Sequence, residues 1–145
     1  MGEEGDERMA LKITSADRWV SKCVREAADW TCCRCGKKHQ EGSQGLHASH
    51  GYSRGNWSVR FNTELNIRAA CYGCHSIEGG HWMSRLLDPY QQALLDEMKD
   101  CTARGKLYRR TKGVGEIAKH YREQYDMLRQ LRECGATGPL PIEDW

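Results

Sequence analysis

Two Cys-x-x-Cys pairs are the groups in this chain best suited to bind a metal ion. They are Cys32 with Cys35 and Cys71 with Cys74. Thiolates three residues apart on a tight turn can bind one ion together, and two such pairs supply the four ligands of a closed, tetrahedral zinc site. Cys33 could pair with Cys35 at a tighter spacing, but we favour Cys32 and regard Cys33 as a spare thiol. The spacing predicts a structural zinc ion rather than disulfides.

Histidines lie inside and directly after the segment that these cysteine pairs enclose. His47 and His50 fall between the pairs, and His75 follows Cys74. A neutral imidazole can bind a metal ion, and it can also accept a proton near neutral pH. We therefore expect the structural zinc to hold a second, catalytic metal site in position.

The middle of the chain, residues 30–81, is rich in Gly, Ser and Asn and poor in aliphatic residues. Its candidate strands are short and cover residues 45–50 and 67–71. Such a segment buries too little apolar surface to fold by hydrophobic burial alone, so a metal ion is expected to stabilise it. Structural zinc can contribute on the order of 10 kcal/mol of apparent binding free energy, which would offset this deficit.

Helices are expected on both sides of this segment. Thr14 or Ser15 can cap a first helix that runs to about Ala28. Asp88 as the cap and Pro89 at the first position mark the start of another. A last helix carries apolar residues at three- and four-residue spacing, namely Val114, Ile117, Ala118, Tyr121, Tyr125, Leu128 and Leu131. This apolar stripe is predicted to pack inside the chain, and it is also one candidate for a dimer interface.

Positive charge is concentrated in one place, although the formal net charge of the chain is only +2. The run over residues 104–112 holds five cations and no acid, namely Arg104, Lys106, Arg109, Arg110 and Lys112. Such a run suits contact with nucleic-acid phosphates, but it also suits a solvated connection between helices.

No apolar run in the sequence is long enough to span a bilayer. The first residues, Met-Gly-Glu-Glu-Gly-Asp-Glu-Arg, are acidic and do not have the pattern of a secretory signal. We therefore expect a cytoplasmic protein with no membrane partner.

The segment between the cysteine pairs resembles the NinG/Rap family of phage recombination endonucleases. The order is a histidine on a strand, an asparagine in the following loop, and a histidine directly after a Cys-x-x-Cys pair. The matching sequences are His-Ala-Ser-His-x-x-Ser-Arg-Gly at 47–55, Arg-Phe-Asn at 60–62, and Asn66 five residues before the second pair. The family belongs to the HNH, or ββα-metal (His-Me finger), superfamily. It is similar to endonuclease VII-type resolvases in placing the catalytic strand between two zinc knuckles.

This resemblance implies a role for each matching residue. His50 matches the general base that activates water, and Asn66 matches the asparagine that bonds across the loop and orients that base. His75 matches a ligand of the catalytic cation, although NinG-like sequences typically have asparagine there. From the chemistry of the guanidinium group, Arg54 or Arg60 could clamp the scissile phosphate bidentately, and each could instead contact a phosphate away from the reaction or be a solvated side chain.

One ligand of the catalytic metal departs from the HNH pattern. HNH enzymes usually have Asp or His directly before the base, where this chain has Ser49. Because alternate residues of a strand face the same side, His47 could supply the missing ligand from the side of Ser49, or else contact DNA or pack. His81, six residues after His75, is a further candidate. The resemblance implies Mg²⁺ or Mn²⁺ as the catalytic ion.

The fold implied is mainly α, with a small zinc-stapled ββα-metal core, an N-terminal helix and a C-terminal helical pair. We expect a disordered lead-in at 1–11, the nuclease core at 12–87, C-terminal helices at 88–135 and an irregular tail at 136–145.

The function implied is a metal-dependent DNA endonuclease that hydrolyses phosphodiesters in branched DNA, such as Holliday junctions or D-loops. A homodimer is implied as well, since symmetric cleavage of a junction needs two active centres. Two alternatives stay open: a non-catalytic zinc-ribbon protein that binds DNA as a recombination accessory, and an HNH nicking or restriction-type nuclease that acts on ordinary duplex.

Overall fold

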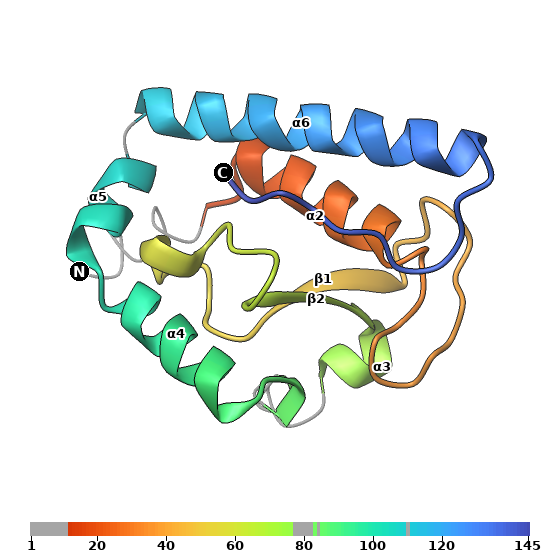
Figure 1. Cartoon of the computed structure of the whole chain (residues 1–145), viewed down its shortest axis with the longest axis horizontal. Helices are drawn as coiled ribbons and strands as arrows, with labels where there is room; N and C mark the ends of the chain where they lie inside the picture. The colour runs from red at the N-terminus through yellow and green to blue at the C-terminus, as the bar shows by residue number, and fades with distance from the viewer. Residues whose placement is uncertain (1–11, 77–82, 84, 110) are drawn as a thin grey trace.

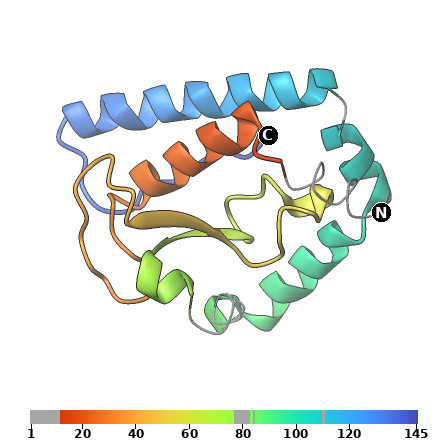
Figure 2. The same ribbon diagram turned by 180° about the vertical axis from the view of Figure 1, so that it is seen from behind.

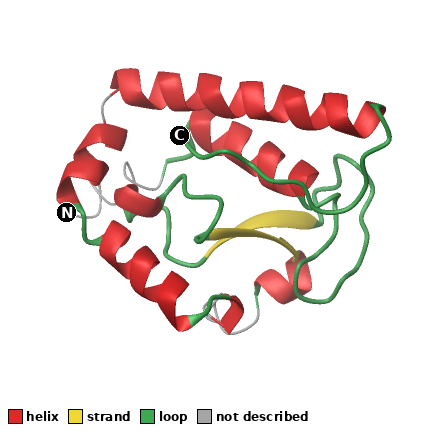
Figure 3. Cartoon of the chain, viewed as in Figure 1, coloured by secondary structure: helices red, strands yellow, loops and turns green. Residues whose placement is uncertain are grey.

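The computed structural model describes residues 12–76, 83, 85–109 and 111–145. The predicted lead-in at 1–11 lies outside these residues. Helices dominate, and a two-stranded antiparallel sheet lies among them (Figures 1 and 3). None of the helices in the described ranges combines the length and the apolar character needed to cross a membrane.

The first helix that the structure describes, α2 (Ser15–Ala27), begins where the sequence predicts it. Thr14 is the N-cap, and its hydroxyl accepts a hydrogen bond from the backbone N–H of Asp17. The Asp17 carboxylate in turn accepts from the Thr14 backbone N–H at 2.8 Å. This reciprocal pair is a capping box, which satisfies donors that the first turn leaves without partners.

Helix α6 (Thr111–Glu133) lies along α2, on the side away from the sheet (Figure 1; from behind in Figure 2). Ile117, Tyr121 and Leu128 of its apolar stripe are buried against α2 and the core. The stripe therefore packs within the chain, as predicted, and its buried part is not free to form a dimer interface. The helix ends before Gly135, whose φ of +97° suits a glycine after a helix.

The two predicted strands are confirmed as β1 (Leu46–His50) and β2 (Ile67–Cys71). They pair in antiparallel register, with His47 opposite Ala70 and His50 opposite Ile67. A one-turn helix, α3 (Tyr72–His75), follows β2 without a loop. The second cysteine pair thus spans the end of a strand and the start of a helix.

The loop between the strands, with the short helix η1 (Trp57–Val59), packs against two further helices. One is α4 (Pro89–Lys99), where Asp88 forms the predicted cap and Pro89 holds the first position. The other is α5 (Thr102–Arg109), which turns part of the basic run into a helix. The C-terminal helical pair predicted from sequence is therefore a set of three. Burial of Tyr108 explains α5, because its ring packs edge-on against Phe61.

The tail at 136–145 contains neither helix nor strand, as predicted, yet it is held in place at its end. The Asp144 carboxylate accepts hydrogen bonds from the Thr63 backbone N–H at 3.0 Å and from the Tyr121 hydroxyl at 2.9 Å. One hydrophobic core includes residues from both sides of the boundary predicted at 87/88. The tail and the core together join the strand loop to α6.

A buried ion pair fixes the same loop to α2. The Arg60 guanidinium donates to both carboxylate oxygens of Asp17, at 3.0 and 2.8 Å, and the whole side chain is buried. Burial by itself would raise the pKa of Asp17, but hydrogen bonds from Arg60 and Thr14 outweigh it and hold this pKa below its usual value. The pair is bidentate, which is the strong geometry for arginine and carboxylate.

Asp17→Asn is expected to lower the free energy of unfolding by roughly 3–5 kcal/mol, because it leaves the buried charge of Arg60 without its counter-charge. Urea denaturation at neutral pH measures this change. The matched control is Glu123→Gln, an exposed carboxylate on α6, for which we expect a change within about 0.5 kcal/mol. Similar small effects for both variants would contradict the importance of the pair.

Candidate functional site

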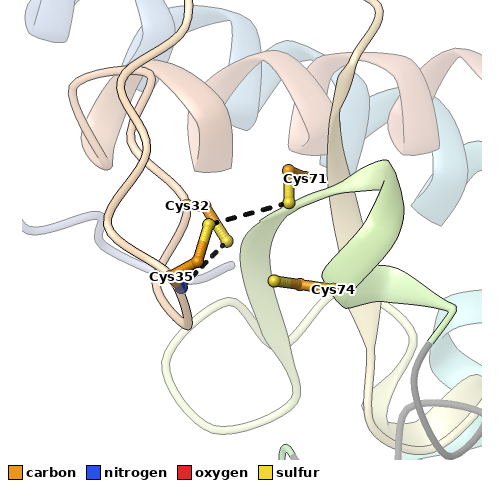
Figure 4. Close-up of side chains that lie close together, drawn as sticks. All are labelled: Cys32, Cys35, Cys71 and Cys74. Atoms are coloured by element: carbon orange, nitrogen blue, oxygen red, sulfur yellow. Dashed lines mark hydrogen bonds between the residues drawn. The ribbon is translucent and has the colours of Figure 1, made fainter.

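Four cysteine thiols converge where the loop after α2 meets the junction of β2 and α3 (Figure 4). The Sγ atoms of Cys32, Cys35, Cys71 and Cys74 all lie within 4.8 Å of one another. Cys35 Sγ lies 3.8 Å from Cys71 Sγ, and a tetrahedron with Zn–S bonds of about 2.3 Å has edges of about 3.8 Å. All eight cysteines are free thiols. The donor set therefore fits a structural metal ion such as zinc.

The backbone around the first pair explains how the thiols are aimed. Gly36 has a φ of +76°, which permits the tight turn after Cys35. The backbone N–H of Cys33 donates to the Ala69 carbonyl at 2.8 Å and so attaches this turn to β2. The Cys33 side chain stays outside the thiol cluster, in agreement with its predicted place as a spare thiol.

The thiols differ in their readiness to ionise. Burial would raise the pKa of Cys32, but backbone N–H groups, first that of Cys35, lower it to about 6. Burial and then the charge of Cys32 raise the pKa of Cys33 to about 11. Burial, and then hydrogen bonds with the thiols of Cys71, Cys35 and Cys32, raise the pKa of Cys74 to about 12 against the lowering effect of Arg34. The Cys32 thiol therefore ionises near neutral pH and the Cys74 thiol does not, whereas a bound divalent cation deprotonates its thiol ligands.

Three histidines and two arginines line one cleft of about 730 Å³ beside the sheet. The histidines are His47, His50 and His75, which the sequence singled out. Arg54 is the predicted phosphate clamp, whereas Arg25 of α2 was not predicted. No Asp or Glu is among the described residues that line the cleft. The cleft therefore favours an anion.

His50 is held as a neutral imidazole. Its Nε2 lies 3.1 Å from the Arg60 carbonyl oxygen, and because a carbonyl can only accept, Nε2 carries the proton. Nδ1 is then the basic nitrogen. Burial, followed by the charge of Arg54, lowers the pKa of His50 to about 4. At neutral pH this imidazole is therefore unprotonated, and its Nδ1 is available as a weak base.

Asn66 holds the loop that orients His50. Its Oδ1 accepts from the Tyr52 backbone N–H at 2.7 Å, and its Nδ2 donates to the carbonyls of Tyr52 and Val59, both at 3.0 Å. The side chain is fully buried. At Gly51 there is little room beside this amide, since a Cβ would lie 3.2 Å from Asn66 Oδ1. The amide therefore closes the loop whose Arg60 carbonyl contacts His50.

His75 is placed by Ser49 and His47. Ser49, the residue directly before His50, is buried, and its Oγ lies 2.5 Å from His75 Nδ1. The His47 ring stacks on His75, with 5.2 Å between ring centres and 13° between planes. Because Ser49 engages Nδ1, the Nε2 of the exposed His75 ring is the atom that could bind a metal ion.

The donors for a second metal ion are few. Among the residues that the structure describes, the four cysteines form the one group of three or more side chains able to hold an ion together. His47 and His75 line the cleft and could each supply one imidazole ligand, and their rings lie within 13° of parallel instead of turning their edges toward a common point. His81 lies outside the described residues. Two imidazoles fit a hydrated divalent cation with open positions better than a closed site.

The expected DNA contact at Arg60 is wrong. Its guanidinium is completely buried and bound to Asp17, and it lies 4.2 Å from the centre of the Trp57 ring. The sequence singled out Arg60, but its ion pair with Asp17 could not be predicted, because Asp17 lies 43 residues earlier in the chain. Arg60 instead serves the site through its backbone carbonyl. Arg54 is partly exposed, with its Nε 3.8 Å from Asp17.

Three of the residues predicted to contact phosphate, Arg104, Lys106 and Arg109, lie on α5. Lys106 and Arg109 are exposed and border a second cleft, of about 300 Å³, together with Lys99. Arg104 is half-buried and donates to the Tyr108 hydroxyl at 2.9 Å. Arg110 and the side chain of Lys112 lie outside the described part of the chain.

We expect the wild-type protein to hold about one zinc ion per chain, and Cys74→Ser to lose both this ion and the fold, because metal binding and folding are linked in such sites. Elemental analysis and circular dichroism measure the two losses. Cys33→Ser is the matched control and should keep its zinc. Equal zinc contents in the two variants would contradict the four-thiol assignment.

The pKa of His50 makes stability depend on pH. It lies at about 4 in the folded protein against 6.5 in the unfolded chain, so the unfolded chain binds more protons between these values. The free energy of unfolding should fall as pH drops from about 6.5 to about 4, by on the order of 3 kcal/mol from this residue. Urea denaturation across this range should show a smaller fall for His50→Gln, whose amide can still donate to the Arg60 carbonyl. Parallel curves would contradict the shift.

Comparisons with known proteins find no match: no family model, no curated protein and no solved structure is significantly similar to this chain. They neither support nor oppose the resemblance to NinG/Rap endonucleases. What the cleft does must therefore be inferred from the side chains that line it.

Proposed function

We propose that this chain is an HNH-type, metal-dependent DNA endonuclease that hydrolyses phosphodiesters in branched DNA. The observation that carries the proposal is the shared cleft: His50 and His75 both line it, Arg54 lies beside them, and the described lining holds no carboxylate. A base, a metal-binding imidazole and a phosphate-binding cation are the parts that phosphodiester hydrolysis needs. The order β1, β2, α3 is compatible with a ββα-metal core.

In this mechanism each side chain acts on one part of the reaction. His50 takes a proton from the attacking water through Nδ1, because its Nε2 is bound to the Arg60 carbonyl. Asn66 keeps that carbonyl in place by closing the loop. Arg54 binds a non-bridging phosphate oxygen and balances its charge. The deeply lowered pKa of His50 keeps the base unprotonated over a wide pH range.

His75 and His47 would hold the catalytic divalent cation. When bound, this ion supplies Lewis-acid stabilisation of the charge that develops on the phosphate and the leaving oxygen. Mg²⁺ and Mn²⁺ are the ions that the family resemblance implies. The donors here are imidazoles, which transition-metal ions accept more readily than Mg²⁺ does, and Mn²⁺ is therefore our first choice.

Preference for branched DNA, and with it a homodimer that presents two active centres, is proposed on the family resemblance. The stripe of α6 that is buried on α2 is not part of the dimer interface. A dimer would have to use another surface.

A non-catalytic DNA-binding module is the second candidate function. The observation that favours it is Ser49, which is a poor metal ligand and is already occupied by His75. Such a module would use the cysteine cluster for folding and the exposed cations of α5 for binding. It would have no need for a neutral, oriented His50.

His50→Ala is expected to reduce cleavage of a synthetic four-way junction by about 10²–10⁴-fold, the usual contribution of a general base, while DNA affinity is kept. Single-turnover gel assays with Mn²⁺, with Mg²⁺ and without added metal measure the rate. His120→Ala, a half-buried histidine on α6 that does not line the cleft, is the control and should cleave like the wild type.

Two outcomes decide between the candidates. Undiminished cleavage by His50→Ala would remove the proposed base, and binding without cleavage by the wild type under every metal condition would favour the binding module. Comparing the junction with its separate linear arms tests the substrate. Equal rates on both would indicate a nuclease for ordinary duplex.

A further inference from the structure

Arg25 is the second cation of the cleft that His47, His50 and His75 line, and its guanidinium has no acidic partner among the described residues. Its Nε donates to the Ser21 carbonyl oxygen at 3.2 Å, and the guanidinium lies 5.1 Å from the centre of the Trp30 ring. Neither partner carries a negative charge. Within the described ranges, no carboxylate lies at ion-pair distance from Arg25. The two contacts orient the guanidinium without neutralising it.

The surroundings of Arg25 increase its attraction for an anion. Burial lowers its pKa from the usual value, which reports the loss of water around the charge, but an arginine stays charged in proteins. A partly desolvated cation interacts more strongly with an incoming anion than a fully hydrated one does. The described lining of the cleft offers this charge no Asp or Glu.

Arg25 and Arg54 both line the cleft that His47, His50 and His75 share. Arg25 belongs to α2, whereas Arg54 lies in the loop after β1, so the two cations enter the cleft from different elements. One strand of duplex DNA presents a phosphate about every 3.4 Å along the helix axis. Two arginines in one cleft can therefore contact different phosphates of the same strand.

We propose that Arg25 forms a second phosphate subsite in the cleft, which binds a phosphate flanking the one held at Arg54 and His50. This inference rests on the proposed function, and it names the ligand that Arg25 binds in the same cleft, namely the backbone of a single DNA strand. The guanidinium supplies paired N–H donors for two phosphate oxygens, which a lysine cannot do in the same way.

The test is a scan with neutral phosphates. A junction strand carries one methylphosphonate at a time, and binding to the full chain with His50→Ala, which prevents cleavage, is measured by fluorescence anisotropy. We expect at least two sensitive phosphates on the strand. Adding Arg25→Gln should abolish the sensitivity at one flanking phosphate and leave the others. Adding Arg25→Lys instead, which keeps the charge, should retain part of the sensitivity at that flanking phosphate.

Salt dependence gives a second readout. For one lost phosphate contact, the slope of log K against log[salt] should become shallower by about 0.9 on duplex arms or about 0.7 on a single strand. Arg18→Gln is the matched control, because Arg18 is an exposed arginine of the same helix that does not line the cleft. Thermal unfolding shows whether Arg25→Gln is folded, since Arg25 also packs on Trp30.

The outcomes separate this inference from the proposed function. The subsite would be overturned if the protein that keeps Arg25 showed only one phosphate at which a methylphosphonate weakens binding. It would also be overturned if folded Arg25→Gln showed the same sensitive phosphates and the same salt dependence as the protein that keeps Arg25. If the wild type cleaves no DNA, the proposed nuclease function is overturned. The DNA-binding measurements then still decide whether Arg25 binds a phosphate. Absence of measurable DNA binding would overturn both.

Discussion

The convergence of four thiols is the constraint on which the rest of the site depends. It joins the turn after α2 to the point where β2 becomes α3, and His75 is the residue directly after the last thiol. The middle of the chain is poor in aliphatic residues, and hydrogen bonds between two five-residue strands would not hold it alone. A metal ion such as zinc at this cluster would fix α3 against the sheet, and with it the position of the His75 ring.

A second, polar set of contacts holds the other half of the cleft. Asn66 closes the loop between the strands, and the buried pair of Arg60 and Asp17 binds that loop to α2. These contacts give the buried amide of Asn66 and the buried guanidinium of Arg60 hydrogen-bond partners. A buried polar group without a partner would lower the free energy of unfolding. Through the Arg60 carbonyl the loop sets both the orientation and the tautomer of His50. One half of the cleft thus depends on thiols and the other on hydrogen bonds.

Much of the architecture could be read from the sequence because the relevant signals are local. The cap at Thr14 or Ser15, the start at Asp88 and Pro89, and both strands were predicted from residues next to them in the chain. The four thiols were predicted as one group for the same reason, since each pair forms its own turn. Helix α5 was missed, because its stability comes from Tyr108 packing on Phe61, a contact between distant segments.

The sequence by itself determined the ligand types, the helix and strand positions, and the presence of histidines between the cysteine pairs. Only the tertiary structure decided which of these side chains share a cleft. It turned Arg60 inward onto Asp17, placed Ser49 against His75, and brought Arg25 into the cleft that His47 also lines. The physical reason is that burial and charge pairing depend on distance in space, and residues 17 and 60 or 25 and 47 become neighbours only when α2 packs on the sheet.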